Sequence, residues 1–221
     1  MASATAPIAR LFSRDEFQRL VDSGFFAGEK VELLDGAVIT IPPQNTPHAA
    51  TVNRLNYQLM KLCGPEVYIH VQSPIALDEH NQPEPDVVLC APDPLDYAEA
   101  HPGPEQIFLI IEVADSGVRQ DRQQKARVYA RSGIPHYWVV EHRRRRIEAM
   151  SSPDTADGQY RRVRTFRAGQ TLTLPHGQRI AVSTSFLPSD DIRRGAMTHN
   201  IWLLRSCSQA EPGNTAPTAL T

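Results

Sequence analysis

The run of sequence that decides the fold is Ile107-Phe108-Leu109-Ile110-Ile111-Glu112-Val113. Apart from Glu112 it is apolar on both alternating faces, which is typical of a strand in the middle of a sheet that is covered on both sides. Residues 119–132 then follow a helical pattern that closes at Gly133, and residues 136–141 have the pattern of another strand. Strand, helix and strand have the length of a βαβ unit, so the two strands are expected to run parallel.

The sequence on either side of this unit completes an α/β pattern. Ser13 and Glu16 have the spacing of a capping box, which predicts a helix that ends near Gly24 and carries Phe17, Leu20 and Val21 on one face. Asp35-Gly36 predicts a hairpin corner between two short strands. The remaining pattern predicts a helix over residues 48–62 and strands over residues 31–34, 37–41, 67–77, 86–90, 146–150 and 160–166. The fold class is therefore α/β, with a mixed β-sheet flanked by helices.

Length and composition narrow the class of protein. The 221 residues suit one domain with a tail, and no apolar run reaches the roughly 18–20 residues of a membrane helix. The first twelve residues lack the pattern of a secretory signal, and three cysteines are too few for a disulfide scaffold. We therefore expect a cytoplasmic protein with a disordered N-terminus at residues 1–9, a domain at residues 10–188 and a mostly disordered extension at residues 189–221.

Charge is unevenly distributed along the chain. The net charge is −2, which argues against a generally basic nucleic-acid coat. Residues 143–167 nevertheless hold eight arginines against three acidic residues. This segment is either a solvated arginine-rich hairpin or a contact surface for a polyanion.

Two acidic residues stand out because of the apolar strands around them. Asp86 opens one apolar strand, and Glu112 lies within the strand that decides the fold. An acid in such a place pays a desolvation cost unless it is paired or binds a cation. Alternatively, Asp86 is a cap at the entry to its strand and Glu112 forms a buried ion pair with an arginine.

A lysine on the following helix could act together with these acids in one active site. Asp121 and Lys125 are four residues apart, so they form either a surface pair or a helix face from which Lys125 reaches back toward Glu112, beside Tyr129. Two carboxylates supply the oxygen ligands that suit Mg²⁺ or Mn²⁺. Such a metal would polarise a scissile phosphate and lower the pKa of a bound water, while the lysine positions that water.

Six short motifs follow one another along the chain. They are Val31-Glu32-Leu33-Leu34-Asp35-Gly36; Pro42-Pro43 with His48; Glu84-Pro85-Asp86-Val87; Ile111-Glu112-Val113 with Ser116; Asp121 with Lys125 and Tyr129; and Gly133-Ile134-Pro135-His136-Tyr137-Trp138-Val139-Val140. In this order the six motifs resemble the Uma2 family, also called DUF820, over about residues 10–188.

This resemblance implies a restriction-endonuclease-like αβββαβ core with added hairpins, and phosphodiester hydrolysis that depends on Mg²⁺ or Mn²⁺. In the PD-(D/E)XK pattern of that superfamily, Asp86 matches the aspartate and Glu112 the second acid. The lysine expected two residues later is replaced by Ala114, which assigns its role to Lys125. Glu32 matches an acid that contacts the metal directly or through water.

The resemblance also suggests how the substrate is bound. His48 matches a histidine that touches a phosphate or the metal-bound water; alternatively it only starts a helix or packs in the core. Arg119 and Arg122 lie close enough in sequence to contact backbone phosphates, unless they form a solvated helix start.

The favoured interpretation is therefore a metal-dependent DNA endonuclease. Cleavage of both strands usually needs two sites, so we expect a homodimer, with Tyr137, Trp138 and the segment from Ser189 as candidates for its surface. Of these, Trp138 is better suited to the core. Two alternatives remain: a non-catalytic binding or dimerisation module with the same fold, and a metal hydrolase of a non-nucleic substrate with His48 as a ligand.

Overall fold

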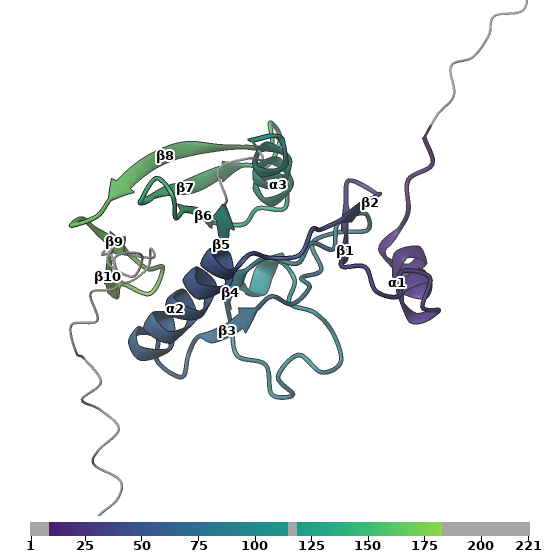
Figure 1. Cartoon of the computed structure of the whole chain (residues 1–221), viewed down its shortest axis with the longest axis horizontal. Coiled ribbons are helices and arrows are strands. Elements are labelled where there is room, and N and C mark those ends of the chain that lie inside the picture. Colours follow the sequence, from purple (N-terminus) through teal and green to yellow (C-terminus); the bar gives the residue numbers. More distant parts are fainter. Residues whose placement is uncertain (1–8, 115–118, 183–221) are drawn as a thin grey trace, which may run out of the picture. The chain divides into compact units, whose positions relative to one another are not determined.

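The fold is built around a six-stranded mixed sheet (Figure 1). The computed structural model describes residues 9–114 and 119–182, apart from the side chains of residues 119–122. The expected N-terminal segment, except its last residue, and the expected C-terminal extension lie outside these ranges. The strand order is β3-β4-β5-β6-β7-β8. The α/β class predicted from sequence is confirmed.

Strand β5 (Ile107–Ala114) lies inside this sheet, as its apolar run predicts. It pairs antiparallel with β4 (Val87–Cys90) and parallel with β6 (His136–Glu141). Helix α3 (Arg119–Arg131) connects β5 to β6, so the predicted βαβ unit is present. Ile110 and Ile111 are both fully buried although they point to opposite faces, because both faces of the sheet are covered.

Different elements cover the two faces. On one face, side chains of α2 (Thr46–Leu62) pack with those of β9 (Thr171–Thr173) and β10 (Arg179–Ala181), which pair as a small antiparallel hairpin. On the other face lie Val128 and Tyr129 of α3. The sequence analysis did not predict β9 and β10, because three-residue strands with one buried side chain each show no clear alternation.

The N-terminal elements form as predicted in most respects. Ser13 and Glu16 make the capping box of α1 (Arg14–Asp22). Strands β1 (Val31–Leu34) and β2 (Ala37–Thr40) form an antiparallel hairpin whose corner, Asp35 and Gly36, has two positive φ angles. Of the apolar residues expected on one face of α1, Phe17 is buried, whereas Val21 at the end of the helix is exposed.

The outer strands of the sheet differ in length from the predictions. Strand β3 (Tyr68–Val71) is shorter than the predicted run over residues 67–77, because Gln72 adopts a left-handed φ of 47° that ends the extended backbone. Strands β7 (Arg146–Asp154) and β8 (Gln159–Arg167) are longer than predicted and form a hairpin. A short 3₁₀ turn, η1 (Pro104–Gln106), leads into β5.

Burial overturns part of the predicted dimer surface. Tyr137 and Trp138 lie in β6 and are both buried within the described structure, so neither supplies a surface for a second copy. Cys90 is also buried, while Cys63 is only partly covered. Among the described residues, no helix combines the length and apolar character needed to cross a membrane.

The turn between β7 and β8 fits tightly against α3, and this contact gives a testable consequence. A Cβ on Gly158, whose φ is 63°, would lie 2.9 Å from Cγ of both Arg127 and Arg131. We expect Gly158→Ala to lower the free energy of unfolding by about 1–3 kcal/mol more than Gly24→Ala, because the added methyl group overpacks the contact. Gly24 is a matched control, since its φ is 75° and its Cβ would meet no atom within 4 Å. Equal losses in urea unfolding would contradict the tight contact.

Candidate active site

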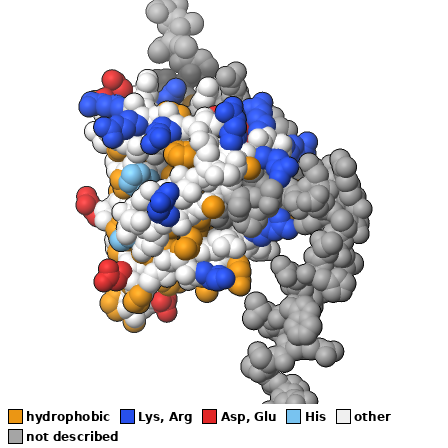
Figure 2. Space-filling model, turned by 90° about the vertical axis from the view of Figure 1, so that its left-hand side faces the viewer, with side chains coloured by type: hydrophobic (Ala, Val, Ile, Leu, Met, Phe, Trp, Pro, Cys, Tyr) orange, Lys and Arg blue, Asp and Glu red, His pale blue; other side chains and the backbone are white. Residues whose placement is uncertain are grey.

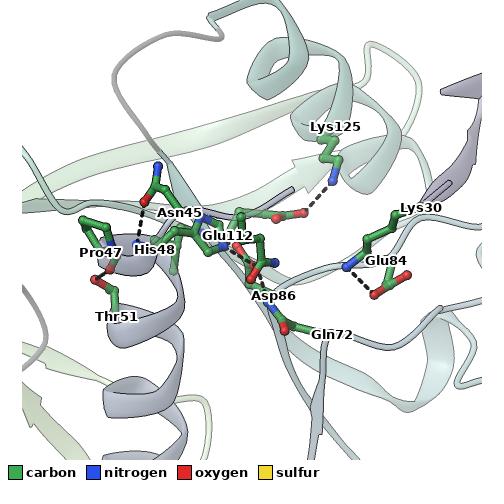
Figure 3. Close-up of polar contacts among 12 residues, drawn as sticks. Lys30, Asn45, Pro47, His48, Thr51, Gln72, Glu84, Asp86, Glu112 and Lys125 are labelled. Carbon is green, nitrogen blue, oxygen red and sulfur yellow. Dashed lines mark hydrogen bonds and ion pairs between the residues drawn. The ribbon is translucent and has the colours of Figure 1, made fainter. Parts of the chain in front are cut away.

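The predicted acids meet where β4 begins and β5 approaches its end (Figure 3). In the antiparallel register Val87 lies opposite Ile111, so the next position places Asp86 opposite Glu112. Both carboxylates therefore come from neighbouring strands of a rigid sheet. This arrangement supports the pairing of Asp86 and Glu112 that the sequence analysis predicted.

Backbone and side-chain donors fix the carboxylate of Asp86. Its Oδ2 accepts a 2.8 Å hydrogen bond from the backbone N–H of Val113, the neighbour of Glu112. Its Oδ1 lies 2.8 Å from Nε2 of His48 and accepts a 3.2 Å hydrogen bond from Nε2 of Gln72. Only 6% of Asp86 is exposed. Asp86 therefore does more than cap the start of its strand, because its carboxylate links the start of β4 to β5, to α2 and to the end of β3.

Lys125 reaches back from α3 to the acids, as proposed from its spacing. Its Nζ lies 3.2 Å from Oε1 of Glu112 and 3.1 Å from Oε2 of Glu32 (Figure 3 draws the first contact). Tyr129, one turn further along α3, donates a 2.9 Å hydrogen bond to the same oxygen of Glu112. Lys125 is only 7% exposed, which excludes the alternative of a solvated surface pair with Asp121. Among the side chains that the structure describes, the ion-pair partner of Glu112 is a lysine rather than the arginine considered from sequence.

The buried position of Glu112 changes its protonation. Burial raises the pKa of Glu112 from 4.5 to about 7, and the nearby charges of Asp86 and Glu32 act in the same direction. The ammonium of Lys125 and the hydroxyl of Tyr129 oppose this rise. Burial also raises the pKa of Tyr129 well above its usual value, so its hydroxyl stays a neutral donor. Glu112 is therefore poised to exchange its proton near neutral pH.

Glu32 is almost completely buried beside Lys125. Only 2% of it is exposed, and its Oε2 accepts a 3.2 Å hydrogen bond from the backbone N–H of Glu84 besides contacting Lys125. The same segment is held from outside by an ion pair of 2.6 Å between Lys30 and Glu84. These contacts join the β1–β2 hairpin to the loop before β4. They favour Glu32 as the residue that holds Lys125 in place.

The structure adds two residues that the sequence analysis missed. Gln72 carries its amide to Asp86 from a strained left-handed backbone position, and Nε2 of Gln44 lies 3.5 Å from the same carboxylate oxygen. A positive φ is an unfavourable backbone conformation for a residue other than glycine, and at Gln72 it accompanies the contact of the side chain with Asp86. Neither glutamine interrupts an apolar run or belongs to a motif, so no sequence signal pointed to them.

Of the three residues expected to bind substrate, the structure describes the side chain of His48 and not those of Arg119 and Arg122. His48 lies in the first turn of α2, where the side chain of Asn45 accepts a hydrogen bond from its N–H, and it turns its ring to Asp86. This position at the edge of the site is compatible with a contact to substrate. Arg119 and Arg122 belong to the first turns of α3, but their side chains lie outside the described residues.

The donor set fits a hard divalent cation that keeps much of its own hydration. In the part of the chain that the structure describes, no group of three or more His, Cys, Asp and Glu side chains is arranged to hold a metal ion. Mg²⁺, however, is usually bound by one or two carboxylates together with waters and substrate phosphates. Asp86 and Glu112 provide these two carboxylates, and both described side-chain contacts of Glu112 go to Oε1, which leaves Oε2 for a ligand.

Comparisons with known proteins bear on the family and the fold of this chain. A family model described as "Uma2: Putative restriction endonuclease" matches residues 14–185. A solved structure described as "a putative nuclease belonging to DUF820 from Anabaena variabilis ATCC 29413" is similar, with a TM-score of 0.60 and 14% sequence identity. The likeness covers 81% of this chain and 98% of that one, and at this identity it concerns the fold. A search of curated proteins finds no match.

The raised pKa of Glu112 predicts how stability depends on pH. Between pH 4.5 and about 7 the folded protein holds a proton that the unfolded chain has released, so folding stability falls as pH rises through this window. The glutamine of Glu112→Gln cannot titrate. We therefore expect the wild type to lose stability relative to this variant over that range, in metal-free urea unfolding. Glu66→Gln, which alters an exposed acid, is the control. A difference that stays constant with pH would contradict the burial of a protonated Glu112.

The contact of Lys125 with Glu32 predicts energetic coupling between them. Lys125→Met should cost about 3–5 kcal/mol of folding stability, because it leaves two buried carboxylates without their cation. In the double variant with Glu32→Gln, the loss should fall short of the sum by about 0.5–3 kcal/mol. Urea unfolding of the four proteins measures this coupling, and additive losses would show that Glu32 acts independently of Lys125.

Proposed function

Because this chain belongs to the Uma2 family of restriction-endonuclease-like proteins, we propose that it is a divalent-metal-dependent endonuclease that hydrolyses phosphodiester bonds of DNA. The family and the structural neighbour support a nuclease-like function. Metal dependence and DNA as the substrate are the parts that we add.

One observation carries the proposal. Asp86 and Glu112 lie opposite each other on the neighbouring strands β4 and β5, and buried Lys125 of α3 contacts the carboxylate of Glu112. Lys125 is there although the lysine position of the superfamily pattern is occupied by Ala114. A fold that served only for binding would not need a desolvated lysine and two buried acids in one place. The arrangement therefore favours catalysis over the non-catalytic module.

The acids would hold the metal. Asp86 and Glu112 would bind Mg²⁺ or Mn²⁺, which supplies a Lewis acid for the scissile phosphate and a bound water of lowered pKa. The hydrogen bond from Val113 and the contacts of His48 and Gln72 keep the carboxylate of Asp86 in one orientation. Binding would also displace the proton that metal-free Glu112 holds near neutral pH.

Lys125 would act on the water and the phosphate. Its ammonium is fixed between Glu112 and Glu32, so it reaches the reaction centre with little loss of side-chain freedom. There it would orient the attacking water and offset the charge that develops on the phosphate oxygens. His48, Arg119 and Arg122 would contact phosphates around the scissile bond, and a homodimer would supply the second site for cleavage of both strands.

A plasmid-nicking assay tests this function. Purified protein with supercoiled plasmid and Mg²⁺ or Mn²⁺ should nick the DNA, and chelation should abolish nicking. Asp86→Asn and Lys125→Met should each lower the rate by about 10²–10⁴-fold, since each removes a group that acts on the reacting atoms. Asp154→Asn and Lys61→Met alter polar residues outside the site and should retain the rate.

The possible failures of this experiment are distinct. Nicking that survives both site variants would assign the activity to another site or a contaminant. Absence of nicking by the wild type, with Mn²⁺ binding that is lost in Asp86→Asn, would indicate a metal hydrolase of another substrate. Absence of metal binding in a folded wild type would favour the non-catalytic module.

A further inference from the structure

One residue beside the candidate active site adopts an unfavourable backbone conformation. Gln72, which follows β3, has a φ of 47°, in the left-handed region where glycine, asparagine and aspartate are usually found. Those residues adopt this conformation at a lower cost than glutamine does. The presence of a glutamine at such a position therefore indicates a use of its side chain.

The backbone of Gln72 fixes the point from which its side chain starts. Its N–H donates a 3.1 Å hydrogen bond to the carbonyl oxygen of Asp86, one position beyond the pair of Val71 and Val87. The side chain then returns to the same residue, with Nε2 at 3.2 Å from Oδ1 of Asp86 (Figure 3). Nε2 of Gln44 lies 3.5 Å from this oxygen and comes from the loop before α2. Of the two amides, that of Gln72 is the closer one and the one tied to Asp86 by its own backbone.

The two carboxylate oxygens of Asp86 differ in the groups that contact them. Oδ2 accepts its hydrogen bond from the backbone N–H of Val113, which is fixed within β5. Oδ1 is contacted by the side chains of Gln72 and His48, which can turn. Oδ1 is therefore the oxygen at which a cation can replace the present contacts. An N–H group directed at that oxygen would repel the cation, so the amide of Gln72 has to change its orientation when a metal binds.

A primary amide can meet a carboxylate with one end and a cation with the other. Its NH₂ group donates hydrogen bonds, and its carbonyl oxygen is a ligand of the kind that suits Mg²⁺ and Mn²⁺. Half a turn of the Gln72 amide about its last side-chain bond exchanges the two ends while the backbone stays in place. Together with Asp86 and Glu112, the amide oxygen would give the metal three oxygen ligands, which still leaves positions for water and phosphate.

We propose that Gln72 is a third oxygen ligand of the metal ion at the candidate active site. Its amide donates to Asp86 in the absence of metal and presents its oxygen when Asp86 and Glu112 bind the ion. This inference rests on the metal dependence of the proposed function, but metal binding can be measured without DNA and without cleavage.

Other acidic groups on the described surface give little competition for a metal probe. Within residues 9–114 and 119–182, no three His, Cys, Asp or Glu side chains are grouped so that they could hold a metal ion. On the face that Figure 2 presents, Asp and Glu side chains are few and scattered, while Lys and Arg side chains gather over its upper part. Binding that is lost in Asp86→Asn therefore measures the candidate site.

Calorimetric titration of the full chain with Mn²⁺, in the absence of DNA, tests the proposal. For Gln72→Gly we expect binding at least about tenfold weaker, because glycine accepts the left-handed conformation but brings no oxygen ligand. Ser152→Gly is the matched control: Ser152 is exposed on β7 and has a φ of 60°, so its replacement relieves the same kind of strain and should leave the affinity unchanged. Urea unfolding verifies that both variants are folded.

A second variant, Gln72→His, separates a metal ligand from a residue that only orients Asp86. Histidine also tolerates a positive φ and can donate to a carboxylate, but its ring nitrogen suits Zn²⁺ better than an amide oxygen does. If this position binds the metal, the ratio of Zn²⁺ affinity to Mn²⁺ affinity at the Asp86-dependent site should rise by at least about tenfold. If it only donates to Asp86, the ratio should stay as in the wild type.

Each outcome supports or overturns the proposal. Unchanged Mn²⁺ affinity in Gln72→Gly, or an unchanged affinity ratio in Gln72→His, overturns it, while Asp86-dependent binding with nicking would leave the endonuclease standing. Equal losses in Gln72→Gly and Ser152→Gly would assign the effect to the backbone and overturn it as well. Gln72-dependent metal binding without nicking would support the ligand and contradict the endonuclease. Absence of Asp86-dependent metal binding in the wild type overturns both.

Discussion

The ion pair between Lys125 and Glu112 is the interaction on which the candidate site depends. Two acids buried at 3.1 and 3.2 Å from one ammonium are tolerable only because that ammonium is present. The three partners come from β1, β5 and α3, which are far apart in sequence. The site is therefore complete only when the β1–β2 hairpin, the sheet and the crossover helix have all packed, so its chemistry is coupled to the correct fold.

Supplying the lysine from a helix rather than from the strand has structural consequences. A lysine at position 114 would lie on the same strand and the same face as Glu112, whereas the position of Lys125 is set by the packing of Val128 and Tyr129 on the sheet. Tyr129 then donates to the same oxygen that Lys125 contacts. Movement of α3 would change the charge and the hydrogen bonding of Glu112 together, which makes the helix a determinant of its pKa.

The free-energy cost of burying a charged group explains which parts of the site could be predicted from sequence. Glu112 and Asp86 were evident because a carboxylate in an apolar strand demands a partner, and Lys125 because it is one of three lysines and follows that strand on a helix. Gln72 and Gln44 carry no such cost, and the contact of Gln72 arises from a left-handed backbone position that only the folded chain shows. Likewise, the burial of Tyr137, the exposure of Val21 and the short β9–β10 hairpin follow from packing between distant segments.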